Sequence, residues 1–236
     1  MSEQETAGRS SPEVDTTPLL ETVEITTGSE PNTSVIWLHG LGADGHDFEP
    51  IVPALSWPGA PAIRYVFPHA PVRPVTINGG MPMRAWYDIR ELGGRAQDQA
   101  GIAHSVAQVS RLLEREQSRG IDARRIVLAG FSQGGAIALQ LALRHPQRLA
   151  GVMGLSTYLL DAGRLDLEAA PENRDLPVFI AHGTMDPVVP FSLGESAANA
   201  LRRMGYPVDW KTYPMPHSVS PDEVSDITGW LRRQLG

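Results

Sequence analysis

The sequence predicts a single α/β domain in which a mostly parallel sheet carries helices on both faces. From Leu19 onward, short β-rich runs alternate with helical patterns. Most of these runs are continuously apolar, which is typical of parallel strands buried on both faces. The length of 236 residues favours one domain with a substantial core. Residues 1–18 are rich in Ser, Thr, Glu and Pro, so we expect a disordered polar tail there and one domain over residues 19–236.

The predicted sheet has about seven strands, each a short apolar run bounded by turn-forming residues. The candidates are residues 20–27, 34–38, 63–67, 125–129, 151–155, 177–181 and 208–213. Because helices separate most of these strands, ligands are expected beyond the carboxyl ends of the strands.

Apolar spacing predicts two long helices between the strands. Residues 97–119 carry apolar side chains at helical spacing and end before Gly120. Residues 133–144 carry a second apolar stripe that ends before Pro146. Both segments follow the expected order of strand and helix in a doubly wound sheet.

Two capping signatures predict where two later helices begin. Ser192 precedes Glu195 by three residues, and Ser220 precedes Glu223 by the same spacing. In such a capping box the serine hydroxyl accepts a backbone N–H of the first turn, and the acid side chain accepts the backbone N–H of the serine. We therefore expect helices after Ser192 and after Ser220.

One connection is far longer than the usual few residues. Residues 68–96 separate the third strand from the next helix. Met81, Met83, Trp86 and Tyr87 give this segment too much apolar content for disorder, so we expect it to pack over the strand ends. These four residues are candidates for lining an acyl pocket, with ordinary core packing as the alternative.

Composition excludes several classes of function. A net charge of −7 provides no basic footprint for nucleic acid. The absence of cysteine removes disulfides, thiolate metal sites and cysteine nucleophiles, and the histidines show no paired metal spacing. No apolar run approaches the length of a membrane span. We expect a cytoplasmic protein with no metal, no cofactor and no stable membrane insertion.

The segment from Gly130 to Gly134 fits the pattern G-x-S-x-G around Ser132. An apolar strand precedes it and a helical pattern follows it, which is the context in which a sharp turn exposes a serine hydroxyl. The pattern alone also occurs in glycine-rich turns where serine only caps a helix. The flanking strand and helix favour Ser132 as a nucleophile.

A nucleophilic serine requires a base and an acid, which follow it in the chain order Ser, acid, His. His217 lies in a loop beyond the last predicted strand, whereas His182 precedes the best-placed acid, so His217 is the better base. Asp186 lies in a tight loop after a strand, unlike the acids of the polar segment 161–175. Taken singly, Asp186 and His217 could also be ordinary loop residues.

Acyl transfer also requires donors for the oxyanion. We expect the backbone N–H of Gln133, directly after the nucleophile, and the N–H of Leu41 in the loop His39-Gly40-Leu41-Gly42. That loop follows an apolar strand, and it lacks the spacing of a phosphate-binding glycine loop. His39 is expected to make structural hydrogen bonds in this turn.

The motifs HGLGADG, MRAWYDI, GFSQGG, GTMDPVVP and PMPH, in this order, resemble the carboxylesterase and acyl-protein thioesterase family of α/β-hydrolases, most closely its small bacterial carboxylesterase branch. The resemblance covers the chain from about Leu19 to its end. It implies an α/β-hydrolase fold without a large cap domain and a possible homodimer. It also implies the triad Ser132, Asp186 and His217 with oxyanion donors at Leu41 and Gln133.

The expected activity is hydrolysis of short- to medium-chain acyl esters through an acyl-enzyme. Ser132 attacks the carbonyl, His217 transfers the proton, and Asp186 orients the imidazole. The alternative substrates are protein-bound thioesters and lysophospholipids. A peptidase or a non-catalytic binding module is a further alternative, although all three members of the triad are present.

Overall fold

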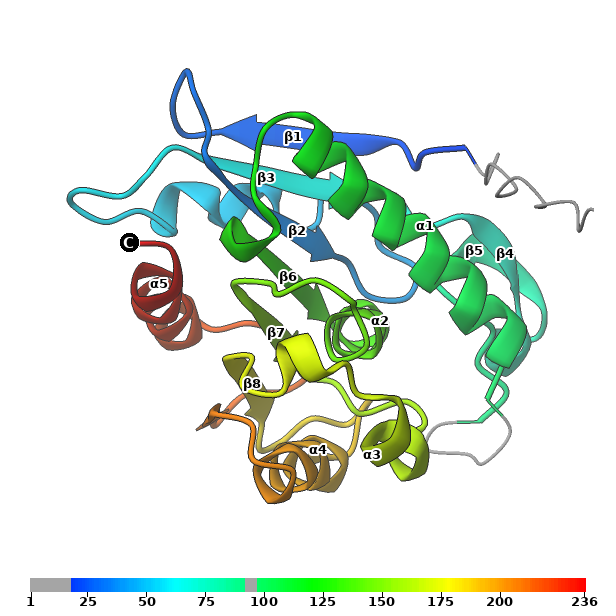
Figure 1. Cartoon of the computed structure of the whole chain (residues 1–236). Coiled ribbons are helices and arrows are strands. Elements are labelled where there is room, and N and C mark those ends of the chain that lie inside the picture. The colour runs from blue at the N-terminus through cyan, green and yellow to red at the C-terminus, as the bar shows by residue number, and fades with distance from the viewer. Residues whose placement is uncertain (1–17, 92–96) are drawn as a thin grey trace, which may run out of the picture.

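A seven-stranded sheet forms the centre of the molecule in the computed structural model, which describes residues 18–91 and 97–236 (Figure 1). Its strands are β1 (Thr22–Thr26), β2 (Thr33–Leu38), β3 (Ile63–Pro68), β6 (Ile126–Phe131), β7 (Gly151–Leu155), β8 (Val178–Gly183) and β9 (Val208–Tyr213). Their order is β1-β3-β2-β6-β7-β8-β9; β1 pairs antiparallel with β3, and every other pair is parallel. The seven predicted strands are confirmed, each end within two residues.

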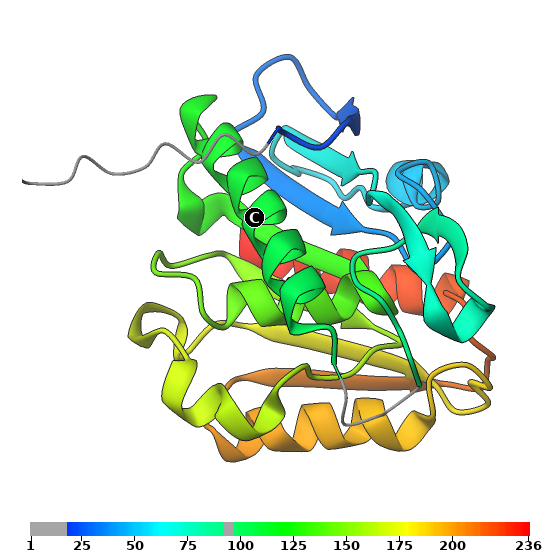
Figure 2. The ribbon, with the colours of Figure 1, turned by 90° about the vertical axis from the view of Figure 1, so that its right-hand side faces the viewer.

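Helices cover both faces of this sheet, as predicted (Figures 1 and 2). One face carries α1 (Gln99–Ser118), α2 (Gln133–Ala142), the short α3 (Leu165–Glu168) and α4 (Phe191–Arg203), and the other carries α5 (Pro221–Leu235) and a 3-10 helix (Glu49–Ala54). A hydrophobic core lies on each face of the sheet, and successive side chains of β2 point to opposite cores. Ile36 packs with α1 and α2, whereas Trp37 packs with α5. This alternation explains why β2 is apolar throughout.

The helix starts agree only in part with the capping signatures. Ser220 Oγ accepts the Glu223 N–H at 3.2 Å at the start of α5, as predicted. The prediction for Ser192 is wrong, because α4 begins at Phe191 and no side chain caps it. Pro190 takes the N-cap position with a non-helical ψ of 131°, so Ser192 already lies in the first turn of the helix.

The long connection contains a hairpin that the sequence did not predict. Strands β4 (Val72–Val75) and β5 (Met81–Arg84) pair antiparallel, joined by a 3-10 turn (Thr76–Asn78). Pro74 and Pro82 face each other in this pairing, and prolines within such runs argue against a strand because they cannot donate to the ladder. Arg84 C=O accepts the Gly42 N–H at 2.9 Å, which confirms that the connection packs at the strand ends. Its last residues, 92–96, lie outside the described residues.

The order of the strands along the chain reverses between β2 and β6. From β2 the chain continues to β3 on one side, and from β6 it continues to β7 on the other side. The crevice outside the carboxyl ends of β2 and β6 is therefore the expected ligand position in an open α/β sheet. The register pairs Leu38 with Gly130, so the loops after these strands leave the sheet side by side.

Candidate active site

Ser132 occupies a sharp turn between β6 and α2. Its φ of 54° and ψ of −121° are unusual for a residue with a side chain. The turn depends on close packing, because a Cβ at Gly134 would lie 2.5 Å from the carbonyl oxygens of Leu38 and His39. Ser132 is 8% exposed. The strand, turn and helix around the motif are therefore as the sequence predicts.

Asp186 and His217 meet at the ends of two neighbouring strands, β8 and β9. His217 Nδ1 donates to Asp186 Oδ2 at 2.6 Å. The other oxygen, Asp186 Oδ1, accepts the backbone N–H groups of Val188 at 2.8 Å and Val189 at 2.9 Å. The fully buried carboxylate thus accepts three donors, and the bond at Nδ1 leaves His217 Nε2 free to act as a base.

The rings of Phe131 and His217 connect this pair to the serine. Their centroids are 4.6 Å apart, and Phe131 directly precedes Ser132. The His217 side chain is 15% exposed, so it lies at the surface of the crevice rather than within the core. The three residues predicted as a triad are thus placed around one end of the sheet.

His182 is also close to Asp186 but is a poor candidate for the base. Its Nε2 donates to Val189 C=O at 3.0 Å and lies 3.4 Å from Asp186 Oδ2. The side chain is fully buried, and this burial lowers the pKa of His182. A neutral, enclosed imidazole can support Asp186 but has no access to a substrate.

The loop after β2 lies against the serine. A Cβ at Gly40 would be 3.5 Å from Ser132 Cβ. Gln133 is the first residue of α2, a position whose N–H has no acceptor within the helix. Among the hydrogen bonds of the described residues, none uses the N–H of Leu41. Both predicted oxyanion donors are thus available for a ligand.

His39 makes two hydrogen bonds inside the same loop, as predicted. Its Nε2 accepts the Ala70 N–H at 3.0 Å, so the ring proton is on Nδ1, which lies 2.7 Å from Gly40 C=O. Burial lowers the pKa of His39 to about 4. The imidazole is therefore neutral at neutral pH and makes structural contacts.

The Gln133 side chain fixes the segment after β5. Its Oε1 accepts the Trp86 N–H at 2.8 Å, and its Nε2 donates to Tyr87 C=O at 2.7 Å. Trp86 Nε1 donates to His39 C=O at 2.9 Å. Trp86 is fully buried, so its side chain supports the two loops and does not line a pocket. This burial favours the core-packing alternative for Trp86, and a contact with the acyl group stays a prediction.

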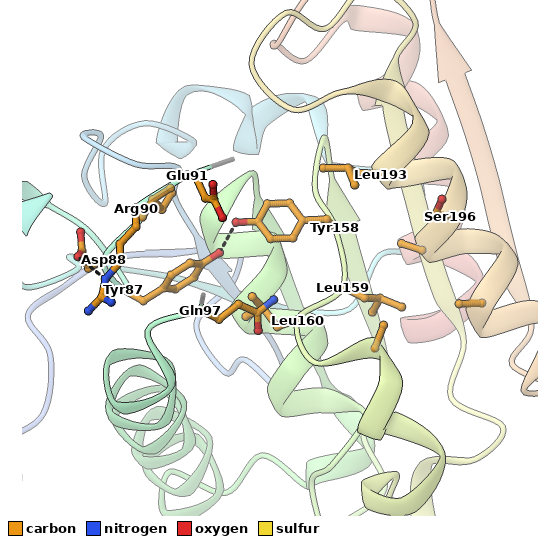
Figure 3. Close-up of a pocket in the computed structure, with 14 residues that line it drawn as sticks. Tyr87, Asp88, Arg90, Glu91, Gln97, Tyr158, Leu159, Leu160, Leu193 and Ser196 are labelled. Carbon is orange, nitrogen blue, oxygen red and sulfur yellow. Dashed lines mark hydrogen bonds and ion pairs between the residues drawn. The ribbon is translucent and has the colours of Figure 1, made fainter. Parts of the chain in front are cut away.

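A pocket of about 230 Å³ lies between the segment after β5, the loop after β7 and α4 (Figure 3). The hydroxyl groups of Tyr87 and Tyr158 are 2.7 Å apart at this pocket, and both side chains are largely buried. Its aliphatic lining comprises Ile89, Leu159, Leu160, Ala162, Leu193, Ala197 and Ala200. Its polar lining comprises Asp88, Arg90, Glu91, Gln97 and Ser196.

Two hydrogen bonds connect the residues of this pocket to the turn around Ser132. Tyr87 is held by Gln133, and Tyr158 follows Thr157, whose Oγ1 donates to Ser132 C=O at 2.6 Å. Met81 is 60% exposed and Met83 is half-buried, and neither lines this pocket. Tyr87 lines this pocket, whereas the Met83 sulfur would lie 3.9 Å from a Cβ at Gly42 in the loop after β2, and substrate contacts of Met81 and Met83 stay a prediction.

Sequence reasoning missed Thr157 and Tyr158. They follow the apolar run of β7, and the sequence signal available was their position at the carboxyl end of a predicted strand. Nothing in their residue types distinguishes them from other polar loop residues. Their relation to Ser132 depends on the pairing of Phe131 with Leu155.

The described residues contain neither a metal-binding cluster nor a membrane-spanning helix. No group of three or more His, Asp or Glu side chains within residues 18–91 and 97–236 is arranged to hold a metal ion. In the same part of the chain, no helix is both long and apolar enough to cross a membrane.

Comparison with known proteins identifies the family. The profile of the phospholipase/carboxylesterase family matches residues 20–235. The chain belongs to the phospholipase/carboxylesterase family. It is accordingly a hydrolase of carboxylic esters with an α/β-hydrolase fold, as the resemblance of its motifs implied.

Relatives in this family match the chain over most of its length. Acyl-protein thioesterase 1 of Gibberella zeae is 39% identical over 219 residues, which are 88% of this chain and 92% of the relative. A probable carboxylesterase of Oryza sativa is 36% identical over 205 residues, covering 85% of this chain and 77% of the relative. The crystal structure of Zea mays acyl-protein thioesterase 2 has a TM-score of 0.81 at 31% identity, covering 92% of this chain and all of the other.

Proposed function

We propose that the chain hydrolyses acyl esters through a covalent acyl-enzyme on Ser132, with His217 as the base and Asp186 as the residue that orients it. The observation that carries this proposal is the 2.6 Å bond from His217 Nδ1 to a fully buried Asp186 carboxylate beside the strained serine turn. Such an arrangement at the ends of different strands is the geometry of a serine hydrolase.

The chemical steps follow from these positions. Ser132 Oγ bonds to the substrate carbonyl carbon while His217 Nε2 accepts its proton, and the negative oxygen is bound by the N–H groups of Leu41 and Gln133. The tetrahedral intermediate then expels the alcohol or thiol, which takes the proton from His217. Water repeats the attack, releasing the carboxylic acid and the free serine.

The pocket lined by Tyr87 and Tyr158, whose segments are hydrogen-bonded to the turn around Ser132, supports an acyl group of short to medium length. Its volume of about 230 Å³ is below the range of roughly 300 to 1,000 Å³ typical of sites for drug-sized ligands. Its aliphatic wall suits an alkyl chain, which gains about 0.8 kcal/mol for each buried methylene.

A protein-bound thioester is the second candidate substrate, because curated relatives are named acyl-protein thioesterases. The same acyl-enzyme serves both substrates, since only the leaving group differs. Rates for matched oxygen esters and thioesters of one acyl chain separate the two activities.

The test compares wild type with Ser132→Ala on p-nitrophenyl esters from acetate to palmitate. The variant should lose about 10⁴-fold or more in kcat/KM, the effect of removing a triad member. The optimum in wild type should fall below the longest chains. A variant that retains the wild-type rate would show that Ser132 is not the nucleophile.

A further inference from the structure

We infer that His39 and Thr157 are positioning residues that set the direction of the two oxyanion N–H groups by holding the carbonyl oxygens of the same peptide units. This inference rests on the proposed function, because it assigns the oxyanion to the N–H groups of Leu41 and Gln133. Neither side chain touches the substrate; each holds a peptide unit whose N–H group contacts the substrate oxygen.

The first peptide unit joins Gly40 to Leu41. Its carbonyl oxygen lies 2.7 Å from His39 Nδ1 and also accepts the Ala43 N–H at 3.3 Å. Its N–H, on Leu41, is the proposed donor. His39 is 2% exposed, so its ring is enclosed and its position is determined by the protein rather than by solvent.

The second peptide unit joins Ser132 to Gln133. Its carbonyl oxygen accepts Thr157 Oγ1 at 2.6 Å and the Ala136 N–H at 3.2 Å. Its N–H, on Gln133, is the other proposed donor. Thr157 is fully buried. A Cβ at Gly135 or Gly154 would lie 2.9 Å from its methyl carbon, so the threonine is closely packed.

The rigidity of the peptide bond connects the two ends of each unit. The C=O and N–H of a trans peptide point in opposite directions and lie in one plane. A bond that fixes the carbonyl oxygen therefore also fixes the N–H vector. Catalysis by an oxyanion site depends on donors that are oriented before the reaction begins. At both peptide units, a buried side chain donates a hydrogen bond to the carbonyl oxygen.

The tautomer of His39 is itself fixed. The Ala70 N–H occupies the lone pair of Nε2 at 3.0 Å, which leaves the proton on Nδ1 for Gly40 C=O. Asp44, His69 and Arg84 are the other titratable groups whose charges act on this ring. Burial lowers the pKa of His39 to about 4, so the neutral ring is retained between pH 5 and 8.

Thr157→Val tests one half of the inference, because valine keeps the packed shape and removes the hydroxyl. We expect kcat to fall about tenfold to hundredfold with little change in KM, somewhat less than the loss of a whole oxyanion donor. Thr157→Ser, which retains the hydroxyl, should recover most of the activity. Thr33→Val is the matched control: Thr33 is also buried and donates to Ala62 C=O at 3.1 Å, but at the opposite end of β2.

The role of His39 is tested by substituting it with asparagine and with glutamine, whose side-chain amides differ in length. The amide nitrogen of asparagine can replace Nδ1, whereas that of glutamine replaces Nε2. We expect His39→Asn to retain more kcat than His39→Gln, and the order to hold across pH 5 to 8. Affinity for the alcohol product, which carries no anionic oxygen for these N–H groups, should change much less than kcat in both variants.

The outcomes separate this inference from the proposed function. If Ser132→Ala is inactive while Thr157→Val retains wild-type kcat, or loses no more than Thr33→Val, the positioning role is wrong and the nucleophile stands. If kcat falls equally in both His39 variants, together with an equal fall in melting temperature, His39 has only a structural role. Activity in Ser132→Ala would overturn the proposed function itself.

Discussion

Glu223 is fully buried in the first turn of α5, and neither of its carboxylate oxygens has a hydrogen-bond partner among the described residues. Burial raises its pKa to about 8, and the neighbouring carboxylate of Asp226 adds to the shift. Asp226 also accepts the Tyr213 hydroxyl at 2.9 Å. The protonated form of Glu223 is therefore favoured in the folded chain at neutral pH.

This residue makes stability depend on pH. Between pH 4.5 and 8 the folded chain holds a proton on Glu223 that the unfolded chain has released. The contribution of Glu223 is therefore complete below pH 4.5 and is lost as pH rises toward 8. We predict that Glu223→Gln gains unfolding free energy relative to wild type as pH rises through this window, measured by urea denaturation at pH 5 and pH 8.

The matched control for this prediction is Glu195→Gln, because Glu195 is an exposed glutamate of α4. It should follow the wild-type pH dependence. A constant difference between Glu223→Gln and wild type at both pH values would contradict a buried, protonated Glu223.

Members of the candidate site could be predicted from the sequence where residue spacing and chain order indicate them. Ser132, Asp186 and His217 follow from a glycine-flanked serine and from the positions of acid and histidine after strands. Thr157 and the Gln133 side chain could not be predicted, because their partners are backbone groups that the fold brings together. Trp86 was placed in the pocket on its apolar character, which equally suits the core it occupies.

Helix α4 and the loop after β7 form two walls of the pocket, and Leu193 of α4 lines it (Figure 3). The pocket volume is small, so a larger side chain at this position removes a large part of it. A change of one methylene in such a site is worth about 1 to 3 kcal/mol in discrimination.

We predict that Leu193→Trp shifts the optimum toward acetate, with a fall of about tenfold or more in kcat/KM for octanoate relative to acetate. Leu193→Ala should shift the optimum toward longer chains. The measurement is the same series of p-nitrophenyl esters, with Leu167→Trp as a control because Leu167 is 89% exposed outside this pocket. Unchanged profiles in both Leu193 variants would exclude the pocket as the acyl site.

The sheet and the helices that carry a clear apolar pattern could be predicted from the sequence. The hairpin β4–β5 could not, since Pro74 and Pro82 contradict a strand and yet pair across this isolated two-stranded sheet. The start of α4 was misplaced because Asp186 and Pro190 determine the preceding turn, whereas Ser192 lies within the helix. Tertiary contacts override the local capping signal at that point.

At the scale of the whole molecule, the strand order brings segments from distant parts of the chain to one edge. The loops after β2, β6, β8 and β9 supply the proposed oxyanion donors, nucleophile, acid and base. The fold therefore supplies the positions, while the residues at four strand ends supply the chemistry. The family match from residue 20 to residue 235 spans all four loops.

The most direct test of the central claim is covalent trapping by diethyl p-nitrophenyl phosphate, followed by intact and tryptic mass spectrometry. Cleavage at arginines releases residues 126–144, in which Ser132 is the only hydroxyl side chain. We predict one diethylphosphoryl group per chain on this peptide, in parallel with loss of esterase activity, and none on Ser132→Ala. Complete inactivation with the label on any other peptide would contradict Ser132 as the nucleophile.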